Sequence, residues 1–188
     1  MSQLTLLRAA AEVLSCLDEA GLRACVIGGL AVVRWGEPRT TRDVDLTVFA
    51  PFGEEAPVLD LLLARFRARR QDARAFAITS RVVLLYTTAG PEADVSIAGF
   101  PFEQEALELA SAWEAEPGFL LRTCPAEHLI VYKLVAARPI DLVDVEGIVR
   151  RQGRKLDVQR IRYWGRQFAE LKEDPDLLRP FESVFERI

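Results

Sequence analysis

The spacing of hydrophobic positions changes along the chain, and these changes predict its elements. Between Leu4 and Ala20, apolar residues recur at the spacing of one buried helix face. Gly21 follows, where a helix C-cap is expected. An apolar run then predicts a buried strand over residues 23–27, and a glycine pair leads into a short helix over residues 30–35.

The middle of the chain alternates between strand-like and helix-like segments. A strand is predicted over residues 43–49, and an amphipathic helix over residues 54–70. Residues 81–87 and 92–98 predict two further strands. The sequence Thr-Ala-Gly-Pro joins them, which is the composition of a hairpin turn.

The chain changes character near residue 124. A helix over residues 103–113 and a strand over residues 119–123 complete the mixed part. Helices are predicted afterwards over residues 126–137, 140–152, 156–171 and 175–187. We therefore expect an α/β (α+β) protein with a mixed sheet in residues 1–124, and a C-terminal helical subdomain in residues 125–188 that packs on it.

Composition supports a folded chain and excludes several classes. With 188 residues, 50% of them hydrophobic, the chain can bury a substantial core, and no apolar stretch is long enough to span a membrane. The N-terminal segment has acidic residues and helical spacing rather than the basic start of a secretory signal. Cys16, Cys25 and Cys124 are odd in number and far apart, so we expect buried thiols in a cytoplasmic protein. His128 is the single histidine, which excludes mechanisms and metal sites that need two.

Charge is distributed unevenly. The formal net charge of −4 argues against indiscriminate binding to nucleic acid. One basic run consists of Arg65, Arg67, Arg69, Arg70 and Arg74. A second, here called the C-terminal basic cluster, consists of Arg150, Arg151, Arg154, Lys155, Arg160, Arg162 and Arg166. Each of these residues alone is typical of a solvated helix face, whereas the density of the C-terminal basic cluster also fits a surface for a polyanion. Both interpretations stay open.

Three aspartates predict a metal site. Asp43 and Asp45 are two positions apart on a predicted strand, so their side chains share one face, with Leu46 and Val48 on the other. Asp94 opens a later strand, and the three carboxylates converge if the two strands are neighbours. Oxygen ligands without paired His or Cys suit Mg²⁺ or Mn²⁺, and a pair of such ions can assist phosphoryl transfer. Each aspartate alone is also ordinary at the start of a strand or after a turn.

Gly28 and Gly29 follow a predicted strand and open a helix, where backbone N–H groups can face an anion closely. A dinucleotide-binding turn requires G-x-G-x-x-G and an acidic residue at the end of the following strand. A Walker A loop requires Gly-Lys followed by Ser or Thr. Neither pattern is present. The glycine pair and the carboxylates therefore indicate a different type of nucleotide site, with metal-assisted chemistry.

The string GGLAVVRWGEPRTTRDVDL resembles the N-terminal signature of the DNA polymerase beta-type nucleotidyltransferase superfamily. More narrowly, it is similar to the AbiEii-like branch of toxin and abortive-infection nucleotidyltransferases, with a Gly-Gly pair, an Arg-x-Thr approach and D-x-D. A helical lysine and a downstream aspartate of that branch correspond to Lys133 and Asp144 in EHLIVYKLVAARPIDLVDVEGIV. The resemblance covers residues 22–150.

The resemblance implies a minimal nucleotidyltransferase core in residues 1–124 and a role for each matching residue. The implied ligands of two Mg²⁺ ions, with Mn²⁺ as the alternative, are Asp43, Asp45 and Asp94, which with Lys133 form the catalytic set. Asp94 also serves as the base toward the acceptor. The implied nucleotide-binding residues are Gly28, Gly29, Arg39, Thr40, Arg42, Lys133 and Asp144. Lys133 alone is typical of a solvated helix, and the residues before Asp43 are also typical of a solvated loop.

The implied reaction is Mg²⁺-dependent transfer of a nucleoside monophosphate from an NTP to a hydroxyl acceptor. The branch indicates tRNA as a candidate acceptor, a toxin or abortive-infection role, and a cognate antitoxin as a candidate partner. An aminoglycoside-type acceptor is the alternative; it predicts an acidic pocket, for which Glu103, Glu105 and Glu108 are candidates. A non-catalytic protein that binds nucleotide or a partner is the third possibility. Gly29 departs from the commonest pattern of the superfamily, which has a serine whose hydroxyl reaches a phosphate.

Overall fold

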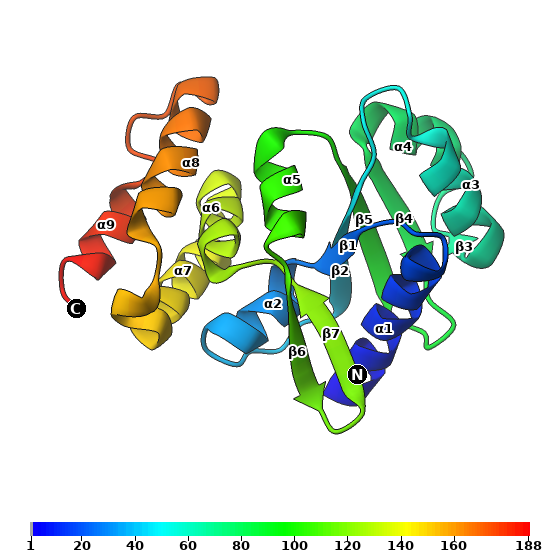
Figure 1. Cartoon of the computed structure of the whole chain (residues 1–188), viewed down its shortest axis with the longest axis horizontal. Helices are drawn as coiled ribbons and strands as arrows, with labels where there is room; N and C mark the ends of the chain where they lie inside the picture. The colour runs from blue at the N-terminus through cyan, green and yellow to red at the C-terminus, as the bar shows by residue number, and fades with distance from the viewer. Residues whose placement is uncertain (1) are drawn as a thin grey trace. The chain divides into compact units, whose positions relative to one another are not determined.

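The computed structural model describes residues 2–188, and within them it contains nine α-helices and seven strands (Figure 1). Contacts within the chain divide it into two compact units. The first runs to Leu30 and continues over Thr40–Cys124, and the second comprises Ala31–Arg39 and Pro125–Ile188. The chain therefore crosses between the units three times, whereas the sequence-based division has one boundary, at residue 124.

The first unit is built on a mixed sheet with the strand order β3-β4-β5-β2-β1-β7-β6. Its strands are β1 (Ala24–Val26), β2 (Asp43–Phe49), β3 (Arg67–Ala68), β4 (Val82–Tyr86), β5 (Glu92–Ala98), β6 (Ser111–Glu116) and β7 (Phe119–Thr123). The central strand β2 is antiparallel to β1 and parallel to β5. β1 and β7 are also parallel, and the remaining pairs are antiparallel. The expected α/β fold with a mixed sheet is confirmed.

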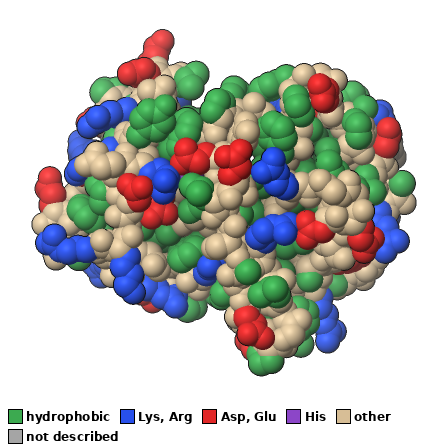
Figure 2. Space-filling model, in the orientation of Figure 1, with side chains coloured by type: hydrophobic (Ala, Val, Ile, Leu, Met, Phe, Trp, Pro, Cys, Tyr) green, Lys and Arg blue, Asp and Glu red, His purple; other side chains and the backbone are tan. Residues whose placement is uncertain are grey.

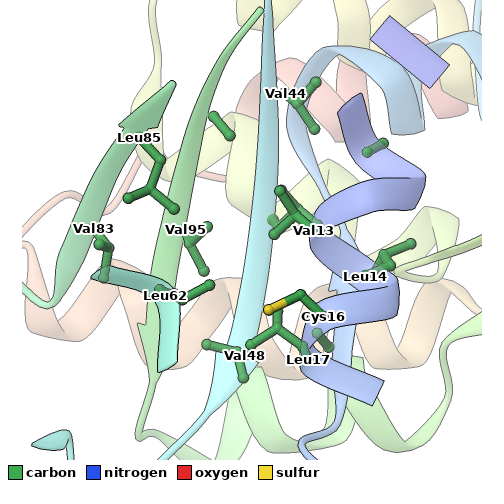
Figure 3. Close-up of a cluster of buried hydrophobic side chains, with 14 of the residues drawn as sticks. Val13, Leu14, Cys16, Leu17, Val44, Val48, Leu62, Val83, Leu85 and Val95 are labelled. Carbon is green, nitrogen blue, oxygen red and sulfur yellow. The ribbon is translucent and has the colours of Figure 1, made fainter. Parts of the chain in front are cut away.

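The core of the first unit lies on one face of this sheet. The helices of the unit are α1 (Gln3–Glu19), α3 (Ala56–Arg65), α4 (Ala73–Ser80) and α5 (Pro101–Glu108). Figure 3 shows Val13 and Leu17 of α1 beside Val44 and Val48 of β2, in the main cluster of buried apolar side chains. Because successive side chains of a strand point to opposite faces, Asp43, Asp45 and Thr47 of β2 project away from this cluster.

Two predicted helices end earlier than expected. The helix predicted over residues 54–70 ends at Arg65, and Arg67–Ala68 form β3 against β4. The helix predicted over residues 103–113 ends at Glu108, and Ser111–Glu116 form β6 against β7. Both strands lie at an edge of the sheet, where pairing with a neighbouring strand outweighs a weak local preference. No element was predicted where α4 lies.

The second unit is helical. The helix α2 (Gly28–Trp35) begins in the first unit and continues into the second, where it is followed by α6 (Ala126–Ala136), α7 (Pro139–Gln152), a 3₁₀ turn (Gly153–Lys155), α8 (Val158–Leu171) and α9 (Arg179–Phe185). The segment after α2 is fastened to α7: Gln152 donates to the carbonyl of Trp35 at 2.6 Å, and Arg151 to that of Gly36 at 2.5 Å. These bonds explain why residues 31–39 group with the helices. None of the helices within residues 2–188 is long and apolar enough to cross a bilayer.

Leu46 provides a test of the core. Its side chain lies in the middle of β2 and is 0% exposed. Leu46→Ala removes buried carbon atoms and leaves a cavity, so we expect the free energy of unfolding to fall by about 2–5 kcal/mol. Leu120→Ala is the control, because Leu120 is 69% exposed, and it should change stability by less than about 0.5 kcal/mol. Urea denaturation followed by far-UV circular dichroism measures both, and equal losses would contradict this placement of the core.

Candidate active site

One face of the sheet carries four carboxylates, which we call the carboxylate face. The parallel register of β2 and β5 places Asp43 opposite Glu92 and Asp45 opposite Asp94. All four side chains alternate with buried residues and therefore project from the face opposite the core. The strands of the three aspartates are neighbours, which is the condition set above for the carboxylates to converge. Glu92 was not predicted, although it precedes Asp94 by the same two positions that separate Asp43 from Asp45.

Arg69 binds two of these carboxylates. It directly follows β3, and its backbone N–H donates to the carbonyl of Leu84 at 2.9 Å. Its Nη1 donates to Glu92 Oε2, and its Nη2 donates to Asp94 Oδ1. The Arg69 side chain is only 16% exposed, so water screens these ion pairs weakly. The sequence analysis named Arg69 only as a member of the basic run over residues 65–74, and not as a site residue.

Asp94 lies in an environment that opposes its ionisation. Burial is the largest cause that raises the pKa of Asp94 above its ordinary value. The charge of Arg69 lowers the pKa, whereas the charges of Asp43 and Glu92 raise it, and the net direction is upward. The carboxylate face thus has an excess of negative charge that a further cation would relieve.

Gly28 allows Asp45 to lie against the start of α2. The φ angle of Gly28 is +59°, a backbone conformation that favours glycine. A Cβ atom at this position would overlap the carboxyl group of Asp45. Without a side chain at residue 28, the Asp45 carboxylate can lie beside the N-terminal end of the helix, where the helix dipole favours negative charge.

Gly29 makes room for Thr41 in the same way. A Cβ atom at residue 29 would stand 2.5 Å from Thr41 Oγ1. Thr41 Oγ1 in turn donates to Asp43 Oδ1 at 3.2 Å. The hydroxyl of Thr41 therefore occupies the space of a side chain at position 29. Thr41 was not among the predicted site residues, although its neighbour Thr40 was.

A second group of charges lies in the helical unit. This group, here called the ion-pair cluster, consists of Arg39, Lys133, Arg138, Asp141 and Asp144. Lys133 Nζ is 2.8 Å from Asp141 Oδ1 and 3.0 Å from Asp144 Oδ2. Arg39 donates to both oxygens of Asp144, at 2.7 and 2.9 Å, in the bidentate geometry that gives arginine its strongest ion pairs. Arg138 donates to Asp141 Oδ2 at 2.6 Å and to Asp141 Oδ1 at 3.1 Å.

The ion-pair cluster contains three of the predicted nucleotide-binding residues, Arg39, Lys133 and Asp144. The side chain of Lys133 is 5% exposed and that of Asp144 is 2% exposed, and each has an ionic partner within the second unit. The side chain of Arg39 is 27% exposed, and its guanidinium binds Asp144. Roles for Lys133 and Asp144 toward a nucleotide stay predictions.

Comparisons with known proteins address the fold. No family model and no curated protein sequence matches the chain. The solution structure of the antibiotic-resistance factor ANT(2'')-Ia matches with a TM-score of 0.60 and 19% identity, over 92% of this chain and 95% of that one. Its crystal structure in complex with adenylyl-2''-tobramycin gives 0.57 and 19%, over 89% and 99%. An antigenic nucleotidyltransferase-like protein from Paracoccidioides brasiliensis gives 0.55 and 14%, over 97% and 94%.

The chain has a nucleotidyltransferase fold. This is the DNA polymerase beta-type fold that the residues Gly28-Gly29 and Asp43-Val44-Asp45 led us to expect. Identities below 20% speak for the fold alone, and the AbiEii-like branch stays a prediction.

The carboxylate face of this nucleotidyltransferase fold fits a divalent cation in its chemistry. Its donors are carboxylate oxygens only, which suits Mg²⁺ or Mn²⁺ rather than zinc. Residues 2–188 contain no group of three or more His, Cys, Asp or Glu side chains already gathered around one point. Asp94 instead shares an oxygen with Arg69. An ion that binds here must therefore share Asp94 with Arg69 or displace it.

The remaining predicted residues lie in different settings. Thr40 and Arg42 are exposed on the segment before β2, and their role toward phosphate stays a prediction. Glu103, one candidate for an acidic acceptor pocket, accepts hydrogen bonds from the backbone N–H groups of Gly99 at 2.8 Å and Phe100 at 3.1 Å. Since these bonds cap α5, the structure gives Glu103 a structural function.

Gly28→Ala tests the packing of Asp45 against α2. Gly118→Ala is a matched control, because Gly118 also has a positive φ, of +82°, but faces open space. The control should lose about 1–2 kcal/mol from backbone conformation alone. Gly28→Ala must in addition displace a carboxylate, so we expect it to lose at least about 2 kcal/mol more. Urea denaturation of both variants makes the comparison, and equal losses would show that Asp45 does not lie against Gly28.

Asp141→Asn tests the ion-pair cluster through its dependence on pH. Burial opposes ionisation of Asp141, but hydrogen bonds from Arg138 and Lys133 outweigh it and hold the pKa of Asp141 below its ordinary value. A lowered pKa in the folded state stabilises the fold above the unfolded-state pKa of about 4, and this contribution is lost as the pH falls through the folded-state pKa.

We therefore expect Asp141→Asn to lower the free energy of unfolding by about 3 kcal/mol at neutral pH, with a smaller deficit from wild type at acidic pH below about 4. Glu146→Gln, which breaks the exposed pair of Glu146 with Arg150 on the same helix, is the control. It should lose less than about 1 kcal/mol. Denaturant titrations at the two pH values measure both, and a deficit that does not shrink in acid would contradict the assignment.

Proposed function

We propose that the chain is a divalent-cation-dependent nucleotidyltransferase that moves a nucleoside monophosphate from an NTP to a hydroxyl acceptor and releases pyrophosphate. The observation that carries the proposal is the register that sets Asp45 beside Asp94, next to the glycine-led start of α2, on a nucleotidyltransferase fold. A carboxylate face and a helix N-terminus side by side suit a metal-bound triphosphate, because one binds the cations and the other the phosphates.

Each residue then has a place in the reaction. The cation, when bound, neutralises the triphosphate. Backbone N–H groups at Gly28 and Gly29 hold the phosphates. Asp94, which lies beside Asp45 in the register of β2 and β5, is the proposed base that takes the proton of the acceptor hydroxyl. The hydroxyl oxygen bonds to the α-phosphorus as the bond to the β-phosphate oxygen breaks, and pyrophosphate leaves. A role toward the phosphates for Arg39, which is paired with Asp144, stays a prediction.

The proposal also includes the class of acceptor, and the observations favour a small molecule over RNA. ANT(2'')-Ia, which binds adenylyl-2''-tobramycin, is matched over 99% of its chain. Most of the C-terminal basic cluster is already engaged: the interactions are Arg150–Glu146, Arg160–Asp157, Arg162–Glu182, and Arg151 with backbone carbonyls. Figure 2 shows both signs of charge spread over the face in view. Since phosphate neutralisation supplies much of the affinity for nucleic acid, these pairs weaken the argument for RNA.

A tRNA acceptor is the second candidate. Arg154, Lys155 and Arg166 of the C-terminal basic cluster are exposed and suit an RNA backbone. The toxin or abortive-infection role and a cognate antitoxin rest on the AbiEii-like resemblance, and they stay predictions.

The first test is label transfer with Asp43→Asn. Protein is incubated with Mg²⁺ and each of four α-labelled NTPs, with an aminoglycoside mixture in one series and total tRNA in another. We expect kcat in Asp43→Asn to fall at least about a hundredfold, because the substitution removes one cation ligand. Asp60→Asn, an exposed aspartate paired with Arg74, should leave kcat within about twofold of wild type.

The outcomes separate the candidates. Label in the aminoglycosides supports the small-molecule acceptor, and label in tRNA supports the RNA acceptor. Full transfer by Asp43→Asn would refute the mechanism. Mg²⁺-dependent NTP binding without transfer to any acceptor would identify a non-catalytic nucleotide-binding protein on the same fold.

A further inference from the structure

The hydrogen bonds of the Arg69 guanidinium differ from those expected of an arginine with a purely structural role. Its two terminal nitrogens both donate to side chains of the carboxylate face, namely Glu92 and Asp94. Its Nε is buried and has no hydrogen-bond partner. A buried donor without a partner is unfavourable, and native structures keep few of them.

Arg81 in the same unit shows the contrast. Its guanidinium donates to the carbonyl oxygens of Ile97 at 2.9 Å, Ala50 at 2.6 Å and Ala98 at 3.2 Å, and it also pairs with Glu55. All its nitrogens bind fixed neighbours, as expected of an arginine that holds loops together. Arg69 binds instead the carboxylates that a cation of the proposed reaction would need.

We propose that Arg69 is a built-in counter-cation of the carboxylate face, which holds Asp94 and Glu92 when no divalent cation is bound and competes with that cation for Asp94. The proposal rests on the proposed function, because it assumes that the carboxylate face is the cation site. Arg69 is a positioning residue: it acts on the cation through Asp94.

The sign of the effect follows from charge. A guanidinium bound to Asp94 occupies one carboxylate oxygen and repels a second positive charge nearby. Removal of Arg69 leaves Asp43, Glu92 and Asp94 with uncompensated negative charge on one face. The nucleotide-free protein should then bind a divalent cation more tightly. In wild type, binding of the free cation is opposed, and a cation that arrives with a triphosphate brings negative charge that Arg69 can also meet.

The test is Mn²⁺ titration of nucleotide-free protein, followed by electron paramagnetic resonance of the free ion. Arg69→Met removes the charge and keeps the length of the buried stem. Arg67→Met is the matched control, since it removes the same charge two residues earlier, where Arg67 stacks over the ring of Tyr86 at 4.2 Å. We expect Arg69→Met to lower the Kd for Mn²⁺ by about tenfold or more, and Arg67→Met to change it by less than about twofold. Asp45→Asn in the Arg69→Met background should abolish the gain.

Each outcome of the titration supports or contradicts the role proposed for Arg69. Tighter binding in Arg69→Met alone supports the proposal. Equal Kd values in wild type and both arginine variants would overturn the proposal about Arg69 and leave the proposed function intact. Weaker Mn²⁺ binding in Arg69→Met would also overturn it, because Arg69 would then favour cation binding. If wild type and both arginine variants bind no free Mn²⁺, the proposal about Arg69 is overturned, whereas the proposed function, in which the cation arrives with the triphosphate, is decided by the label-transfer test.

A folding control keeps the result readable. Far-UV circular dichroism compares the variants with wild type before titration. If Arg69→Met does not fold, Arg69→Lys carries the test, because an ammonium keeps the charge but lacks the fork that spans both carboxylates. Arg69→Lys should bind Mn²⁺ more tightly than wild type by a smaller factor of about threefold, and no difference from wild type overturns the proposal.

Discussion

The candidate site depends on the parallel pairing of β2 with β5. This register is fixed from the opposite face, where Val44, Leu46 and Val48 are buried with the apolar residues of α1. A slip of one residue would bury the aspartates and expose the aliphatic side chains, so the hydrophobic pattern excludes that shift. Burial of such a side chain contributes about 1.5–3 kcal/mol. These contributions outweigh the repulsion between carboxylates that water partly screens, and the core thereby holds like charges side by side.

The two charge clusters show opposite responses to burial. In the ion-pair cluster, hydrogen bonds from Arg138 and Lys133 overcome burial and lower the pKa of Asp141. On the carboxylate face, burial and neighbouring negative charges overcome Arg69 and raise the pKa of Asp94. The first cluster has a cation for every carboxylate and is complete in itself. The second has more carboxylates than cations, and such an uncompensated site is where a ligand gains most by binding.

Sequence patterns predict the parts of this structure that local spacing determines. The bounds of β2, residues 43–49, follow from a largely alternating run of polar and apolar residues, and this alternation places Asp43 and Asp45 on one face. Arg69 could not be predicted, because its partners lie 23 and 25 residues away and meet it only through the pairing of β3, β4 and β5. The sequence alone allowed a solvated helix position for Lys133, because its pairing with Asp141 and Asp144 depends on how α6 and α7 pack. Local pattern does not show which charged side chains from different helices and strands form ion pairs.

Gly29 stands where the superfamily that the sequence resembles most often has a serine, and its surroundings give this difference a physical reason. The hydroxyl that a serine would carry on α2 has a counterpart in Thr41, whose Oγ1 fills the space beside Gly29. A serine at position 29 would collide with Thr41, so glycine there and threonine at 41 are complementary. Because Thr41 also donates to Asp43, this hydroxyl lies between the start of α2 and the carboxylate face. A hydroxyl oxygen is thus present beside Gly29, on the segment that leads into β2.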